Sequence, residues 1–164
     1  MAAPQRENRL RHWLALPVAI LICLAVSGLG AIATEAGPGS WYDGLAKAPW
    51  NPPAWVFAPV WTALYISLGF ALWLIWKAPA GPGRSRALVL FFVQLGLNLA
   101  WSWIFFGLQM PLLALVDLVL LLGAIVATQR AAWWDVPFAG LIMLPYLGWC
   151  AFALTLNAAV VVLN

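Results

Sequence analysis

Five long apolar stretches alternate with short polar stretches along this chain. They predict helices over about residues 13–34, 54–76, 87–106, 112–129 and 136–160. A helix needs about 20 mainly apolar residues to cross the hydrocarbon core of a bilayer, and each stretch comes close to that length. The pattern therefore predicts an all-α integral membrane bundle of five transmembrane helices, in one domain over residues 1–164, with a long loop between the first two helices.

The composition supports a membrane protein. Hydrophobic residues make up 65% of the chain and charged residues 8%, and the mean hydropathy is +0.95. A soluble domain is about half apolar and about a quarter charged. The net charge of +3 comes from residues that flank the apolar stretches, so we expect no nucleic-acid partner.

The basic residues predict the orientation. Seven of them fall on one side of the predicted bundle: Arg6, Arg9, Arg11, Lys77, Arg84, Arg86 and Arg130. Only Lys47 falls on the other side. Because cytoplasmic segments carry the excess of Lys and Arg, we expect the N-terminus in the cytoplasm and the C-terminus outside. Helical spans suit a bacterial cell membrane, since outer-membrane proteins are barrels.

The first apolar stretch has an alternative interpretation. A basic start, an apolar core and Ala31-Ile32-Ala33 also satisfy the pattern of a cleaved secretory signal. The stretch is long enough to span, and the chain stays hydrophobic afterwards. We therefore favour a retained transmembrane helix over processing of residues 1–33.

The longest polar segment, residues 35–51, is stiffened by proline and rich in aromatic residues. It contains Gly37-Pro38-Gly39 and ends at Pro52-Pro53, where proline can open the second helix. A stiff polar segment that follows one apolar span and precedes the next predicts a lid over a pocket.

Polar and aromatic side chains recur at helical spacing in three of the spans. Gln94, Asn98 and Ser102 are four residues apart, so they share one helix face. At about 1.5 Å per residue, Trp61, Asn98 and Trp149 lie at a similar depth. Such stripes often only fill a core, but Trp and Tyr carry donors that need partners. We therefore favour a ligand cavity between these helices.

Two further polar residues are predicted to be structural. Asp117 lies in the fourth span, level with Trp101 and Ser102, and we expect it to be protonated or to accept hydrogen bonds from them. For Asp117 we favour a role in holding helices together over a role in proton relay. Gln94 is also predicted to be a structural polar residue.

Metal and disulfide sites are not expected. His12 is the only histidine, and Cys23 and Cys150 lie in apolar runs, where a thiol behaves as a small hydrophobe. Small residues at close spacing, such as Gly96 and Ala100, allow close helix contact, and we expect a homodimer.

Several motifs in order resemble the tryptophan-rich sensory protein and translocator protein family, once called the peripheral-type benzodiazepine receptor. They are WYDGLAKAPWNPPAW, VFAPVWTALY, QLGLNLAWSWIFFG, ALVDLVL and LPYLGW, between Trp41 and Ala153. The first helix resembles the family only in its general apolar character and carries none of these motifs.

The resemblance implies a usually dimeric five-helix bundle that binds tetrapyrroles such as protoporphyrin IX or haem-type ligands beneath the first loop. Porphyrin would be the ligand, and no cofactor is required. The family's pocket maps onto Trp41, Tyr42, Trp61, Tyr65, Asn98 and Trp149. With the neighbouring positions Trp50, Trp101, Tyr146 and Ala153, these form the predicted ligand-binding set.

We expect a membrane receptor or carrier for porphyrins, in porphyrin metabolism or stress signalling. The first alternative is light-dependent porphyrin degradation, which the resemblance assigns to Trp61 and Trp149; the sequence shows no other catalytic group. The second is sterol or small-molecule transport, which is weaker because no basic residue follows Tyr146. Lys47-Ala48-Pro49 also departs from the family's Lys-Pro, which displaces the proline by one residue.

Overall fold

The computed structural model describes the backbone of residues 3–164 and side chains from residue 14 onward. The predictions that rest on the side chains of Arg6, Arg9, Arg11 and His12 lie outside this description. The described residues are all helical or loop, in the order α1 (Ala3–Ala33), η1 (Ala54–Val56), α2 (Phe57–Lys77), α3 (Pro82–Ser102), η2 (Trp103–Gly107), α4 (Pro111–Ala132), α5 (Pro137–Ile142) and α6 (Leu144–Leu163).

Five spans in the described part of the chain are long and apolar enough to cross a membrane. They are Leu14–Ala33, Ala54–Lys77, Pro82–Gly107, Pro111–Ala132 and Pro137–Leu163. The predicted all-α bundle of five spans is therefore confirmed. Many large apolar side chains on the outer faces of these helices stay exposed, as expected where lipid replaces water.

Prolines mark where the helices begin. Pro82, Pro111, Pro137 and Pro145 each occupy one of the first positions of a helix, where the missing N–H would have no partner in any case. Pro145 separates α5 from α6, so the fifth span is two helices that meet at Met143. The prediction of one interrupted helix over 136–160 is thus refined to a short and a long helix.

Two predicted helix starts are too late. Helix α3 begins at Pro82 instead of residue 87, and α1 begins at Ala3 instead of residue 13. Polar residues mark the edge of the apolar span, but Arg, Gln and Glu are good helix formers and do not end a helix. The third span also ends differently, because residues 103–107 form a π-helical turn.

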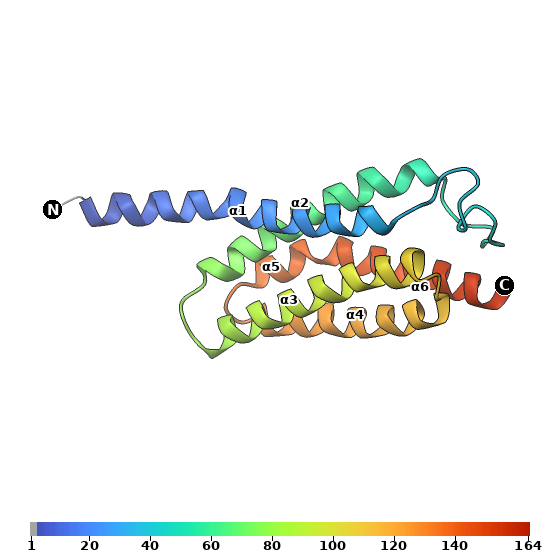
Figure 1. Ribbon diagram of the computed structural model, residues 1–164. Helices are drawn as coiled ribbons and strands as arrows, with labels where there is room; N and C mark the ends of the chain where they lie inside the picture. The colour runs from blue at the N-terminus through green and yellow to red at the C-terminus, as the bar shows by residue number, and fades with distance from the viewer. Residues whose placement is uncertain (1–2) are drawn as a thin grey trace.

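Helices α1 and α2 lie side by side, and α3 packs along α4, which also contacts α6 (Figure 1). The α1–α2 contact depends on Gly69, where an added Cβ would lie 2.6 Å from the Cα of Ile20. Fully buried residues from α2 to α6, such as Leu68, Phe91 and Tyr146, form the core.

The 34–53 loop and the C-terminal end of α6 lie at one end of the bundle, and the α2–α3 and α4–α5 connections lie at the other (Figure 1). This arrangement places the loop above the ends of α1, α2, α3 and α6.

Candidate functional site

A cavity of about 340 Å³ lies beneath the 34–53 loop. Helices α1, α2, α3 and α6, the η2 turn and the loop all contribute to its wall. Its aromatic and amide lining comprises Tyr42, Asn51, Phe57, Trp61, Tyr65, Asn98, Trp101, Phe105, Phe106, Trp149 and Asn157. No lining side chain carries a formal charge, so the cavity suits an apolar ligand with a few polar groups.

Asn98 organises the inner end of the cavity. The Tyr65 hydroxyl donates to Asn98 Oδ1, and Asn98 Nδ2 donates to the Tyr146 hydroxyl at 3.0 Å. All three side chains are buried, and they come from α2, α3 and α6. A buried amide with both ends bonded fixes the two tyrosine rings, because an unpaired polar group there would be costly.

Trp61 and Trp149 form one aromatic wall. Their ring centroids are 6.4 Å apart with the planes at 89°, and Trp61 also contacts Tyr65 and Tyr146. Phe57 meets the Trp149 ring edge-on at 5.9 Å. These contacts hold the two indoles at one depth, as the helix spacing predicts.

Trp101 and Phe105 form a second aromatic pair in the cavity lining. Their rings are stacked, with centroids 5.3 Å apart and an angle of 22°. The Trp101 indole N–H donates to Asn157 Oδ1 at 3.1 Å. The Trp101 indole N–H therefore bonds to Asn157 on α6 and not to Asp117, and protonation of Asp117 stays a prediction.

Asp117 and Gln94 lie outside the cavity lining. Both are buried, and within the described residues Asp117 Oδ2 and both amide atoms of Gln94 have no hydrogen-bond partner. The structural role predicted for Gln94 therefore rests on its burial and not on a hydrogen bond of its amide.

The 34–53 loop is held together by its own polar groups. The Tyr42 hydroxyl donates to Asn51 Oδ1 at 3.2 Å, and Lys47 Nζ donates to the carbonyls of Asp43 and Leu45. Lys47 Nζ also lies 4.8 Å from the centroid of the Tyr42 ring. Burial raises the pKa of Tyr42 although its bond to Asn51 acts in the opposite sense, so this phenol is neutral at physiological pH.

Aromatic contacts seat the loop on the bundle. Trp41 and Tyr42 meet the Phe105 ring edge-on at 5.6 and 6.1 Å, and Tyr42 also contacts Phe106 at 5.5 Å. The loop thus rests on the same π-helical turn that lines the cavity. Single-turn π segments are frequent at functional sites.

The chain matches the model of the TspO/MBR family over residues 19–163. This match covers most of the sequence. The chain belongs to the TspO/MBR family.

Named relatives agree with the TspO/MBR assignment. The tryptophan-rich protein TspO of Chlorobaculum tepidum is 45% identical over 157 residues, which cover 92% of this chain and 96% of the relative. The translocator protein of Homo sapiens is 47% identical over 124 residues, 73% of this chain and 72% of the relative. The tryptophan-rich sensory protein of Cereibacter sphaeroides is 32% identical over 152 residues, 93% of this chain and 92% of the relative.

The structure of this TspO/MBR member brings most of the predicted ligand-binding set together. The residues of the set that line the cavity are Tyr42, Trp61, Tyr65, Asn98, Trp101, Trp149 and Ala153. Three others do not line it. Trp50 is 56% exposed, Tyr146 is fully buried and bonded to Asn98, and Trp41 packs on Phe105.

Other lining residues of this family member lie outside the predicted set. Helix α1 contributes Ser27, Gly30 and Ala31, and the loop contributes Asn51. Ser27 and Ala31 are four residues apart, so their spacing could have indicated a shared face, but it equally suits a packing seam. The sequence shows Asn157 as a polar residue in an apolar span, but it does not show which groups Asn157 bonds.

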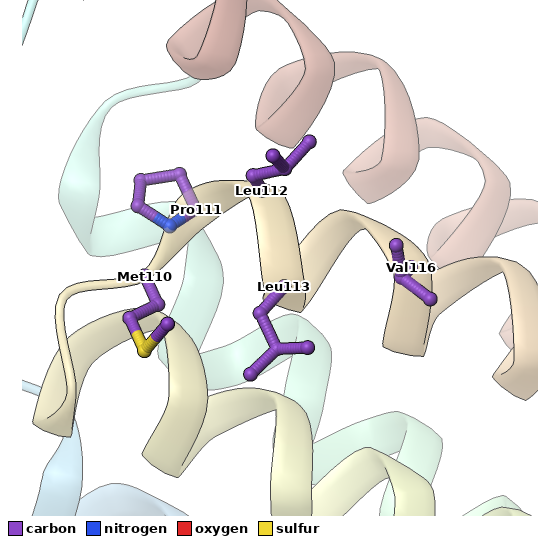
Figure 2. Close-up of a pocket in the computed structure, with 5 residues that line it drawn as sticks. All are labelled: Met110, Pro111, Leu112, Leu113 and Val116. Atoms are coloured by element: carbon purple, nitrogen blue, oxygen red, sulfur yellow. The ribbon is translucent and has the colours of Figure 1, made fainter.

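A second, shallower hollow of about 380 Å³ lies at the start of α4. Figure 2 shows its five lining side chains, Met110, Pro111, Leu112, Leu113 and Val116, along the chain that enters this helix. All five are apolar, so the hollow offers no side-chain group to orient a ligand. We take the cavity beneath the loop as the candidate site.

Proposed function

We propose that this TspO/MBR member is a membrane receptor or carrier that binds tetrapyrroles such as protoporphyrin IX in the cavity beneath the 34–53 loop. The observation that carries the proposal is the convergence of indole and phenol rings from α2, α3 and α6 around one uncharged cavity. A flat aromatic macrocycle stacks well on such rings. The relatives named as sensory and translocator proteins support a receptor or carrier role.

Charge placement supports a ligand with a polar rim. The cavity lining has no formal charge, whereas Lys47 lies in the loop above it. The propionates of a porphyrin would therefore lie toward the loop, and its apolar edge would face Asn98 and Trp61. This orientation keeps both carboxylates near water and avoids the cost of burying them.

The cavity size indicates that binding requires movement of the loop. A volume of about 340 Å³ is at the low end of the range of roughly 300–1,000 Å³ typical for drug-sized ligands. A tetrapyrrole is larger than most such ligands. We infer that the 34–53 loop lifts to admit the macrocycle.

We also propose that the protein lies in a bacterial cell membrane as a homodimer, with the 34–53 loop outside. Lys77 ends α2, Arg84 and Arg86 lie near the start of α3, and Arg130 lies in the last turn of α4. These helix ends are opposite the loop (Figure 1). The excess of basic residues there supports a cytoplasmic location for that end.

The direct test is a titration of the purified protein with protoporphyrin IX in the dark, followed by quenching of tryptophan fluorescence. The substitution Trp61→Ala should weaken binding about tenfold or more, because a large aromatic anchor is removed from the wall. Trp134→Ala, at an 89% exposed indole far from the cavity lining, is the matched control and should bind like the wild type. Equal affinity of Trp61→Ala and the wild type would rule out this site.

A further inference from the structure

Asn157 joins three separate elements through one side chain. Its Oδ1 accepts the indole N–H of Trp101 at 3.1 Å, and its Nδ2 donates to the carbonyl of Pro111 at 2.8 Å. Asn157 lies on α6, Trp101 on the last turn of α3, and Pro111 on the first turn of α4. Asn157 is only 2% exposed, so these bonds are formed away from solvent.

The two partners require an amide at this position. Trp101 offers only a donor, and the Pro111 carbonyl offers only an acceptor. The Asn157 side chain supplies one acceptor and one donor and is therefore oriented in a single way. Leucine has a similar size but would leave both partners unpaired, and aspartate would keep the acceptor while losing the amide donor.

Asn157 completes a set of restraints on the Trp101 ring. One face of the indole stacks on Phe105, and the ring also meets Phe106 at 5.9 Å and 87°. Stacking alone allows an indole to rotate within its own plane and to slide, whereas a hydrogen bond to Nε1 fixes that rotation. Trp101, Phe105, Phe106 and Asn157 all line the cavity.

We propose that Asn157 is a positioning residue that makes the cavity selective for flat ligands by fixing, together with the stacking on Phe105, the orientation of the Trp101 indole. A fixed indole gives the lining that it shares with Trp61 and Trp149 one ring of constant direction. A planar macrocycle gains from this direction because its stacking energy depends on parallel rings, and a puckered molecule does not. This inference rests on the proposed tetrapyrrole-binding function.

Two ligands with the same substituents but different macrocycle shapes test whether the cavity selects for a flat ring. Protoporphyrin IX is planar, and protoporphyrinogen IX carries the same side groups on a macrocycle with saturated bridges, which is not planar. Both are titrated in the dark under nitrogen. We expect Asn157→Leu to weaken protoporphyrin IX binding about tenfold, as the loss of a well-oriented buried contact does, and to change protoporphyrinogen IX binding less than about twofold.

Indole NMR tests the positioning step without a ligand. In protein labelled with ¹⁵N-tryptophan, the Trp101 indole signal is the one that Trp101→Phe removes. Asn157→Leu should move this signal upfield because the N–H loses its acceptor, and Asn157→Asp, which keeps an acceptor, should leave it near the wild-type position. Thr155→Val, on an exposed face of α6, is the matched control and should change neither the signal nor the two affinities.

The outcomes distinguish the two proposals. An unmoved Trp101 signal in Asn157→Leu, or equal losses of affinity for the planar and the puckered ligand, would overturn the role of Asn157. Failure of the wild type to bind protoporphyrin IX, with the Trp101 signal still displaced in Asn157→Leu, would overturn the proposed function and the selectivity while leaving the restraint on Trp101 in place.

Discussion

At the residue scale, two buried asparagines, Asn98 on α3 and Asn157 on α6, have comparable roles. Asn98 bonds two tyrosines at the inner end of the cavity, and Asn157 bonds Trp101 and the Pro111 carbonyl nearer the loop. Each uses one donor and one acceptor of its amide, so each fixes aromatic rings on other helices. In a low-dielectric interior such paired amides rigidify a site, because every alternative arrangement leaves a polar group unsatisfied.

The substitution Asn98→Leu tests whether the Asn98 amide stabilises the inner end of the cavity. The substitution removes the acceptor of Tyr65 and the donor to Tyr146, so we expect the free energy of unfolding to fall by about 2 kcal/mol. Thermal unfolding in detergent, followed by circular dichroism, measures the change. Adding Tyr65→Phe to Asn98→Leu should recover part of the loss, because the stranded hydroxyl is removed; a further loss of similar size would contradict the network.

At the element scale, the 34–53 loop behaves as a small folded unit with one polar attachment to the bundle. Among the described residues, the hydrogen bonds of this loop are internal apart from those at its two ends and those made with Asn164. The backbone N–H of Ala46 donates to Asn164 Oδ1 at 3.0 Å, and Asn164 Nδ2 donates to the Ala46 carbonyl at 3.1 Å. Apolar contacts add to this attachment: Trp41 and Tyr42 contact η2, and Leu45 packs against the cluster that includes Phe105.

Asn164→Ala should loosen the loop and leave the helices intact. Loss of two solvent-exposed hydrogen bonds should speed amide exchange of the loop by about five- to tenfold, with Ala46 most affected. Hydrogen exchange measured by mass spectrometry reports each segment separately. Val162→Ala, 82% exposed on the same end of α6, is the control. If both variants exchange alike, Asn164 does not hold the loop.

For the whole molecule, the two ends of the bundle differ in both charge and structure. One end carries the short α2–α3 and α4–α5 connections with Lys77, Arg84 and Arg130, and the other carries the long aromatic loop (Figure 1). The difference means that orientation in the membrane decides from which side a ligand reaches the cavity.

A pair of single cysteines tests the orientation. Pro38→Cys lies in the 34–53 loop and Ala80→Cys in the α2–α3 connection, and both positions are exposed. With the basic end in the cytoplasm, a membrane-impermeant maleimide should label Pro38→Cys on intact cells and Ala80→Cys only after permeabilisation. The buried native thiols Cys23 and Cys150 provide the background, which the unsubstituted protein measures. The reverse labelling pattern would invert the proposed topology.

The sequence by itself determined the five spans, the long loop and the depth of the aromatic rings. These follow from local rules: apolar length sets a span, proline sets a helix start, and the rise per residue sets the depth. The same rules placed Trp61, Asn98 and Trp149 at one level. These rules predicted starts that are too late for α1 and α3. The reason is that a polar residue can lie outside the apolar span and still belong to the helix.

Only the tertiary structure decided which of these rings line the cavity and which polar groups pair. Trp101 could have donated to Asp117 at the same depth, and it donates to Asn157 because the rotation and contacts of α6 bring that amide to the indole. The same packing buries Tyr146, which is bonded to Asn98, and adds Ser27 from α1 to the lining. Spacing within one helix fixes a face and a height, but the neighbour of that face depends on contacts between segments far apart in the chain.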